Sequence, residues 1–168
     1  MSETSLRLLA SRIAGQADLK DVRTAKLHAE MAFPPAPGAR LSYELRADFE
    51  YGLPEEDGDP TVISGEYTIP LWIIDEDGER DQFAELSFAL VALYEVPDSP
   101  TGEPYRPEEW NAFVQTTGQF ALYPFARETA SMLSTRLGVP PLTLGMLRLR
   151  LDEDEVHDEL AVHDPRPD

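Results

Sequence analysis

The chain has 168 residues, of which 42% are hydrophobic, enough for one domain with a substantial core and little beyond it. A formal net charge of -18, from 14 basic and 32 acidic residues, repels nucleic acid and anionic lipid and favours basic or neutral polypeptides as partners. Cysteine is absent, which excludes disulfides, thiolate metal sites and a cysteine nucleophile, and agrees with a reducing compartment.

The N-terminal residues do not have the pattern of a signal peptide. An acid precedes the leucines of MSETSLRLLASR and an arginine follows soon after, whereas a signal peptide is basic first and apolar afterwards. The longest apolar run, 88–94, is far too short to span a bilayer. We therefore expect a soluble, cytoplasmic protein without membrane insertion.

The first predicted elements are a helix and a strand. Leu6, Leu9 and Ile13 recur at helical spacing behind Ser and Thr residues that can cap a helix, which predicts a short amphipathic helix over 4–16. In residues 25–33 every second residue is apolar, which is the period of a half-buried strand, and FPPAPG then ends the strand.

Three more strands are predicted before the helical region. Residues 41–51 show the cleanest alternation in the chain, and 61–74 resume it after the turn-rich LPEEDGDP. Pro70 has no backbone N–H, so it predicts an edge strand or a bulge. The sequence DEDG at 75–78 is typical of a hairpin turn. The strand that follows, 82–96, is apolar on both faces in its second half, so we expect helices on one face and another subunit on the other.

The next segment is predicted to be helical. Residues 108–117 form the first expected helix, which Gly118 interrupts. Trp110, Phe113, Val114 and Thr117 are expected on one face of it. A second helix is expected to run to Leu137, with a kink or restart at Pro124 and Gly138 as its C-terminal stop. Its expected inward-facing residues are Leu122, Phe125, Ala126, Thr129, Met132 and Leu133.

The order of these elements predicts the fold class. Strands followed by helices, rather than alternating with them, indicate an α+β fold with a four-stranded antiparallel sheet and helices packed on one face. Residues 1–151 are expected to form this single domain. Residues 152–168 are dense in acids and lack aromatic side chains, so we expect a disordered tail.

No pattern of residues indicates enzyme or metal chemistry. Gly-rich phosphate loops, G-x-S-x-G and H-E-x-x-H are absent from the sequence. His28, His157 and His163 are dispersed, and DEDG lacks the remaining ligands of a calcium loop. We therefore predict no catalytic residue, no metal site and no cofactor. A small α+β enzyme or ligand-binding domain is the alternative from another class.

A motif of six consecutive residues lies within 116–147. It consists of Tyr123, Pro124, Phe125, Ala126, Arg127 and Glu128. The segment resembles the helix and following Pro-Leu segment of the SecB-type export chaperones, in which a Phe/Tyr-Pro-Tyr/Phe-Ala-Arg-Glu stretch recurs. The order of elements agrees over about residues 19–150. Further stretches, RIAGQADLKDVRTAK, LSYEL and TTGQFALYPFARE, are similar to the SecB-like proteins of mycobacteria and other actinobacteria, some of which accompany toxin–antitoxin pairs.

The resemblance implies an ATP-independent holdase for unfolded or partly folded polypeptides, assembled as a dimer of dimers, with neither ATP nor metal. A general holdase, which could receive preproteins, is the first interpretation, and a chaperone dedicated to one antitoxin is the second. Export SecB proteins dock on the SecA motor through acidic positions of the sheet. His28 and Ala32 stand where acids are expected on the first strand, which argues against SecA docking.

Client binding is expected to need several apolar subsites along a groove. Burying one large side chain contributes about 1.5 to 3 kcal/mol, whereas micromolar affinity needs about 8 kcal/mol. We expect exposed aromatic residues near the Pro-rich crossover and the first helical turns to line the groove, namely Phe33, Tyr43, Trp110 and Phe113. On this interpretation, Trp110→Ala or Phe113→Ala weakens client binding and leaves the melting temperature nearly unchanged. A position in the core is the alternative for each.

Overall fold

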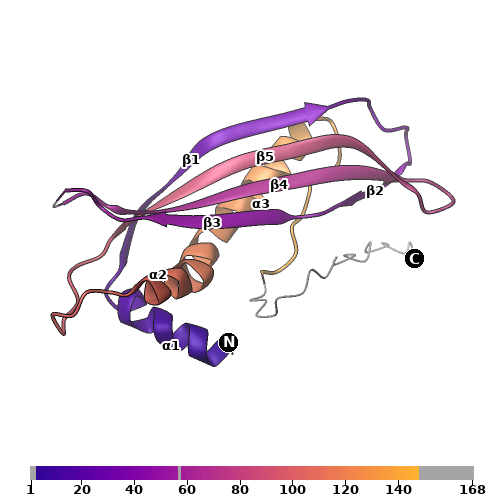
Figure 1. Ribbon diagram of the computed structural model, residues 1–168. Helices are drawn as coiled ribbons and strands as arrows, with labels where there is room; N and C mark the ends of the chain where they lie inside the picture. Colours follow the sequence, from indigo (N-terminus) through magenta and orange to yellow (C-terminus); the bar gives the residue numbers. More distant parts are fainter. Residues whose placement is uncertain (1–2, 57, 148–168) are drawn as a thin grey trace, which may run out of the picture.

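The computed structural model describes residues 3–56 and 58–147, so the predicted tail and the last residues of the predicted domain lie outside the described residues. One antiparallel sheet forms a layer, and the helices lie on one side of it, which confirms the α+β prediction (Figure 1). The elements in chain order are α1 (Glu3–Ala14), β1 (Asp18–Met31), β2 (Arg40–Tyr43), β3 (Arg46–Gly52), β4 (Thr61–Ile74), β5 (Arg80–Glu95), α2 (Pro107–Phe113), η1 (Val114–Gly118) and α3 (Gln119–Arg136).

The sheet has the order β1-β5-β4-β2, and β3 pairs with β4 beside β2. The helix-facing side chains of β5 are buried, as alternation in a one-sided sheet requires; they are Leu86, Phe88, Leu90, Ala92 and Tyr94. On the opposite face Val91 and Leu93 stay half-buried, and no described element covers them (Figure 1). Cover by another subunit on that face stays a prediction.

The predicted strand 41–51 is two strands in the structure, which gives five strands in four positions of the sheet. Tyr43 pairs with Leu71 and Arg46 pairs with Thr68, so the register to β4 is the same on both sides of the interruption. Pro70 lies opposite the gap. Because proline has no backbone N–H, it cannot complete the ladder there.

The structure corrects one part of the prediction for Pro70 and agrees with the other. The strand that holds it, β4, is not an edge strand, because β5 pairs along one side of it and β2 and β3 along the other. A register shift does occur close by, between Leu71 and Trp72 against β5. The Pro70 carbonyl still accepts a hydrogen bond from the Glu44 N–H at 3.4 Å, which holds the two short strands in line.

Strand β1 is longer than predicted. It begins at Asp18, whereas alternation indicated a strand only from residue 25. Its first half is exposed on both faces except for Val22, so this half carries no two-residue hydrophobic period. An edge strand with polar residues on both faces is therefore invisible to a pattern based on burial.

The helical region is continuous, contrary to the prediction. Gly118 does not interrupt it, because the chain passes through the π-helix η1 directly into α3, and Pro124 lies inside α3 without ending it. The predicted stop at Gly138 is confirmed: its φ is 79°, and the Gly138 and Val139 N–H groups donate to the carbonyls of Thr135 and Ser134 at 3.0 and 3.3 Å. This is the pattern that closes a helix with a left-handed glycine.

The buried face of α3 lacks two of the predicted residues and includes three that were not predicted, namely Tyr123, Ala130 and Ser134. Phe125 and Met132 were expected to face inward but are 41% and 37% exposed. The buried residues of α3 are Leu122, Tyr123, Ala126, Thr129, Ala130, Leu133 and Ser134. The prediction treated this helix as starting afresh after Gly118, whereas its rotation is fixed by the turns of α2 and η1 that precede it.

Gly65 gives a test of the packing between β3, β4 and the helices. A Cβ at this position would lie 2.9 Å from Cε1 of Phe49 and 3.0 Å from Cε2 of Tyr67, two rings that meet edge to face. We expect Gly65→Ala to lower the free energy of unfolding by about 1 to 3 kcal/mol, because the new methyl group would force a shift of the half-buried Phe49 ring or of the fully buried Tyr67 ring. In Gly52→Ala the nearest atom is 4.0 Å away, so urea unfolding should show little change.

Candidate functional site

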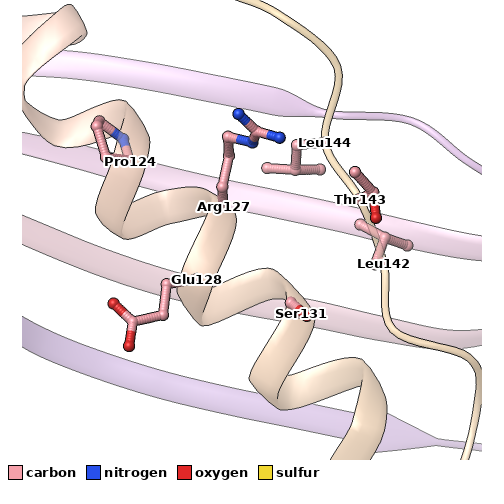
Figure 2. A pocket seen from close by; sticks show the side chains of 7 residues that line it. All are labelled: Pro124, Arg127, Glu128, Ser131, Leu142, Thr143 and Leu144. Carbon is pink, nitrogen blue, oxygen red and sulfur yellow. The ribbon is translucent and has the colours of Figure 1, made fainter.

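A pocket lies between α3 and the segment that follows it, residues 139–147, which we call the strap. Its volume is about 360 Å³. Figure 2 shows the lining side chains, which are Pro124, Arg127, Glu128, Ser131, Leu142, Thr143 and Leu144. The pocket thus combines apolar walls with one cation, one anion and two hydroxyls, so it can contact both apolar and polar groups of a ligand.

Hydrogen bonds fix the strap beside α3, although it has no regular secondary structure. The Tyr43 hydroxyl donates to the Thr143 carbonyl at 2.9 Å, and the Tyr123 hydroxyl donates to the Gly145 carbonyl. The Leu142 N–H donates to the Ser134 hydroxyl at 2.9 Å. Burial raises the pKa of both tyrosines, so they remain protonated donors at neutral pH. The strap, which is the wall of the pocket opposite α3, is therefore preformed.

The six motif residues divide into three groups. Pro124, Arg127 and Glu128 line the pocket (Figure 2). Tyr123 and Ala126 are buried in the core. The sixth, Phe125, is exposed. One turn and a half of helix thus supplies core packing, a pocket wall and an apolar surface residue, because consecutive residues of a helix point in different directions.

Two of the four predicted client-binding residues are not exposed. Trp110 and Phe113 are 6% and 0% exposed, so the expectation of surface side chains is wrong for them. Trp110 stacks on Tyr51 with ring centroids 5.8 Å apart, and Phe113 meets Tyr94 edge to face at 5.3 Å. Helix α2 lies between the sheet and α1, so the sheet covers its aromatic side chains on one side and α1 covers them on the other.

The other two lie at the far end of the sheet and keep part of their surface open. Phe33 is 38% exposed and packs on Phe83 at 6.5 Å, and Tyr43 is half-buried beside the strap. Trp110 contacts Tyr51, which is roughly 26 Å from Tyr43 at the rise of a β-strand. The four residues therefore do not form a single site.

An ion pair that the sequence analysis missed joins α1 to α2. The Arg12 guanidinium donates to Oε1 of Glu109 at 2.8 Å and to Oγ of Ser99 at 2.9 Å. The second carboxylate oxygen of Glu109 accepts the Arg106 backbone N–H at 2.8 Å. The carboxylate is covered by these partners, since Glu109 is 1% exposed. Arg12 and Glu109 are 97 residues apart, so no local pattern indicated the pair.

This arrangement predicts a specific loss of stability in acid. The Arg106 N–H, and then the Arg12 guanidinium, hold the pKa of Glu109 below its usual 4.5. A carboxyl whose pKa is lowered in the folded state contributes stability above the unfolded pKa and loses it as pH falls through the folded pKa. We expect Glu109→Gln to be less stable at pH 7 and to lose less stability than the parent below pH 4.5. Unfolding by urea across pH measures this, with the exposed Glu108→Gln as the control.

The described residues contain neither a metal site nor a membrane span. Across residues 3–56 and 58–147, no group of three or more His, Cys, Asp and Glu side chains is placed to hold a metal ion. Within the same ranges, no helix is long and apolar enough to cross a bilayer.

Comparison with known proteins gives close relatives, although no family model matches. SecB-like chaperone Rv1957 of Mycobacterium tuberculosis H37Rv is 33% identical over 164 residues, covering 86% of this chain and 85% of the relative. SecB-like chaperone MT2006 of the CDC 1551 strain matches to the same extent. Among solved structures, Rv1957 in complex with a ChAD peptide from the Rv1956 HigA1 antitoxin has a TM-score of 0.74 at 27% identity, covering 85% of this chain and 99% of that one.

These relatives agree with the resemblance carried by the Tyr123–Glu128 motif. They are chaperones and not enzymes, which confirms the prediction of a non-catalytic protein. Identity extends over most of both chains, and the fold agrees over nearly the whole of the solved structure. The chain belongs to the family of SecB-like chaperones.

Proposed function

We propose that this protein is an ATP-independent holdase that binds unfolded or partly folded polypeptides at the pocket between α3 and the strap. The pocket carries the proposal, because its walls are preformed, partly apolar and open to a chain segment. Leu142 and Pro124 can receive an apolar side chain, with the buried Leu144 behind them, while Arg127 and Glu128 can meet polar groups of the same segment. Tyr43 adjoins the strap through its hydrogen bond to Thr143, and Phe33 offers a partly exposed ring at the crossover.

Affinity for a floppy chain requires more than one such contact. Part of the interaction free energy is lost in ordering the client, so a single subsite gives weak binding. Trp110 and Phe113 would support the surface from the core rather than touch the client. Several pockets on one assembly would raise affinity by avidity without demanding a particular client sequence.

A second candidate function is that of a chaperone dedicated to one antitoxin. The related Rv1957 structure holds an antitoxin peptide, which favours this alternative over preproteins as clients. A toxin–antitoxin pair beside the gene, and selective binding of a peptide from that antitoxin, would distinguish it from a general holdase. His28 on β1 and Ala32 directly after it do not supply the acids that SecA docking would need, so SecA is not part of the proposal.

The direct test is suppression of aggregation without nucleotide. A test protein kept unfolded by reduction and alkylation should stay in solution at stoichiometric amounts of this chaperone, with ATP making no difference. Unchanged aggregation at a tenfold excess of the chaperone would rule out the holdase.

We further place the protein in the cytoplasm and take residues 1–151 as one folding unit. Cell fractionation tests the first point, and limited proteolysis tests the second.

We further propose a homotetramer, a dimer of dimers. Phe120, Phe125 and Met132 on α3 are exposed apolar side chains that a second copy would cover. We expect light scattering to give about 75 kDa for the 18.8 kDa chain, since oligomers of this kind close with twofold symmetry. Phe125→Glu should reduce the mass, and Leu27→Glu, on the edge strand β1, serves as a charge-matched comparison. A monodisperse monomer at micromolar concentration contradicts the proposal.

A further inference from the structure

Helix α1 packs on the helical region rather than on the sheet. Its contacts are chiefly with α2 and η1, and Figure 1 shows it beside α2 on the side away from the strands. Leu6, Ala10 and Ile13, at helical spacing, are its buried apolar residues. Twelve residues make only a marginal helix in water, so α1 keeps its shape because it is docked.

The docked face is specific because it contains a buried carboxylate. Glu109 lies at the interface between α1 and α2, and Arg12 of α1 forms an ion pair with it beside the buried apolar residues of α1. The same guanidinium reaches Ser99 and Thr101 of the loop before α2, and its carbon lies 5.6 Å from the centre of the Tyr105 ring. A segment without a cation at this position would leave Glu109 with the Arg106 side chain, 3.5 Å away, as its charged partner.

Detaching α1 does not require the sheet to open. Residues 15–17 connect it to β1, and the first strand pair of β1 is Asp18 with Glu95. The Gly15 and Ala17 N–H groups bond to carbonyls of α1 itself, those of Ser11 and Ile13. Undocking of α1 therefore breaks its side-chain contacts with α2 and η1 but no strand pairing, and local opening of this kind costs less free energy than global unfolding.

We propose that the face of α2 and η1 beneath α1 is a second peptide-binding surface, which α1 fills and another segment can occupy in its place. The occupant is an amphipathic client segment with apolar residues at the spacing of Leu6, Ala10 and Ile13 and an arginine in the place of Arg12. Its floor is the aromatic group around Trp110, which contacts Tyr51, Tyr105 and Phe113. The use of this surface by clients rests on the holdase function proposed above, whereas the exchange of α1 does not.

The experiment uses the full chain with Trp72→Phe, which leaves Trp110 as its single tryptophan. A fluorescein-labelled peptide with the sequence of residues 3–17 has to compete with the α1 helix of the chain itself. Only the small fraction of chains in which α1 is undocked can bind the peptide, so its apparent affinity is lower than its intrinsic affinity. Arg12→Met in the chain should raise that affinity by about tenfold, the effect of a lost charge-assisted contact. Acrylamide quenching of Trp110 should rise in the same variant. The peptide carrying Arg12→Met should bind about tenfold more weakly.

Equal binding of the two peptides, or no gain with Arg12→Met in the chain, overturns the proposal. If that variant fails to fold, hydrogen exchange on the unaltered protein decides: amides of α1 should exchange well before those of β4 and β5, and equal protection counts against exchange. Loss of aggregation suppression with intact peptide exchange would refute the holdase alone. Intact suppression without peptide exchange would refute the second surface alone.

Discussion

Replacing Phe113 by alanine is expected to lower the free energy of unfolding by about 3 to 5 kcal/mol. The ring is fully buried, meets Tyr94 edge to face at 5.3 Å and Trp110 at 6.2 Å, and joins α2 to β5. Truncation would leave a cavity whose walls belong to both layers of the fold, so the site has little scope to collapse. Urea unfolding followed by circular dichroism measures the loss.

The matched control is Leu8→Ala, which removes a side chain that is 73% exposed and should change stability by about 0.5 kcal/mol or less. This outcome reverses the sequence-based expectation that Phe113→Ala impairs client binding alone. Unchanged unfolding with weaker client binding would restore the original interpretation and move Phe113 to the surface.

The pattern of the sequence predicted the layers of this fold because the sheet is buried on one side. The helix-facing side chains of β4 and β5 alternate with more exposed ones. The strands at 61–74 and 82–96 could therefore be predicted without knowing which strands pair with them. The α+β class followed from their order. The interruption between β2 and β3 was not readable, because its cause, Pro70, lies on the neighbouring strand.

Local sequence patterns also could not predict which face of α3 is turned toward the sheet. Phe125 and Met132 are apolar and lie at helical spacing with the true core residues of α3, so apolar side chains occur on more than one face of the helix and the period does not decide which face is inward. The π-helix η1 and the close approach of Gly118 to Ile63 set that rotation through contacts with β4. The Arg12–Glu109 ion pair likewise joins residues far apart in the sequence, so a local pattern could not predict it.

The pocket was partly predictable. The family resemblance singled out Pro124, Arg127 and Glu128, which line the pocket, and the sequence indicated Tyr43, which bonds to the strap, as a client contact. The strap residues Leu142 and Leu144 were not, because an extended segment without periodicity reveals its neighbours only in three dimensions.

Filling the pocket should abolish most client binding without unfolding the protein. Ser131 lines the pocket from α3, and its backbone carbonyl, which accepts the Ser134 and Thr135 hydroxyls at 3.0 and 2.8 Å, is kept in any substitution. In Ser131→Trp the indole would occupy space otherwise open to an apolar client side chain. Burial of such a side chain contributes about 1.5 to 3 kcal/mol. We therefore expect the Kd for an unfolded test protein to rise by about tenfold to a hundredfold.

Ser131→Ala is the matched control, since it removes the hydroxyl but leaves the pocket open, and its Kd should stay within about threefold of the parent. Fluorescence anisotropy of the labelled, alkylated test protein gives Kd, and thermal melting shows that both variants fold. If the tryptophan and alanine variants bind alike, clients do not enter this pocket. Binding would then have to be sought at Phe33 on the crossover or on the surface beneath α1, where neither substitution at residue 131 reaches.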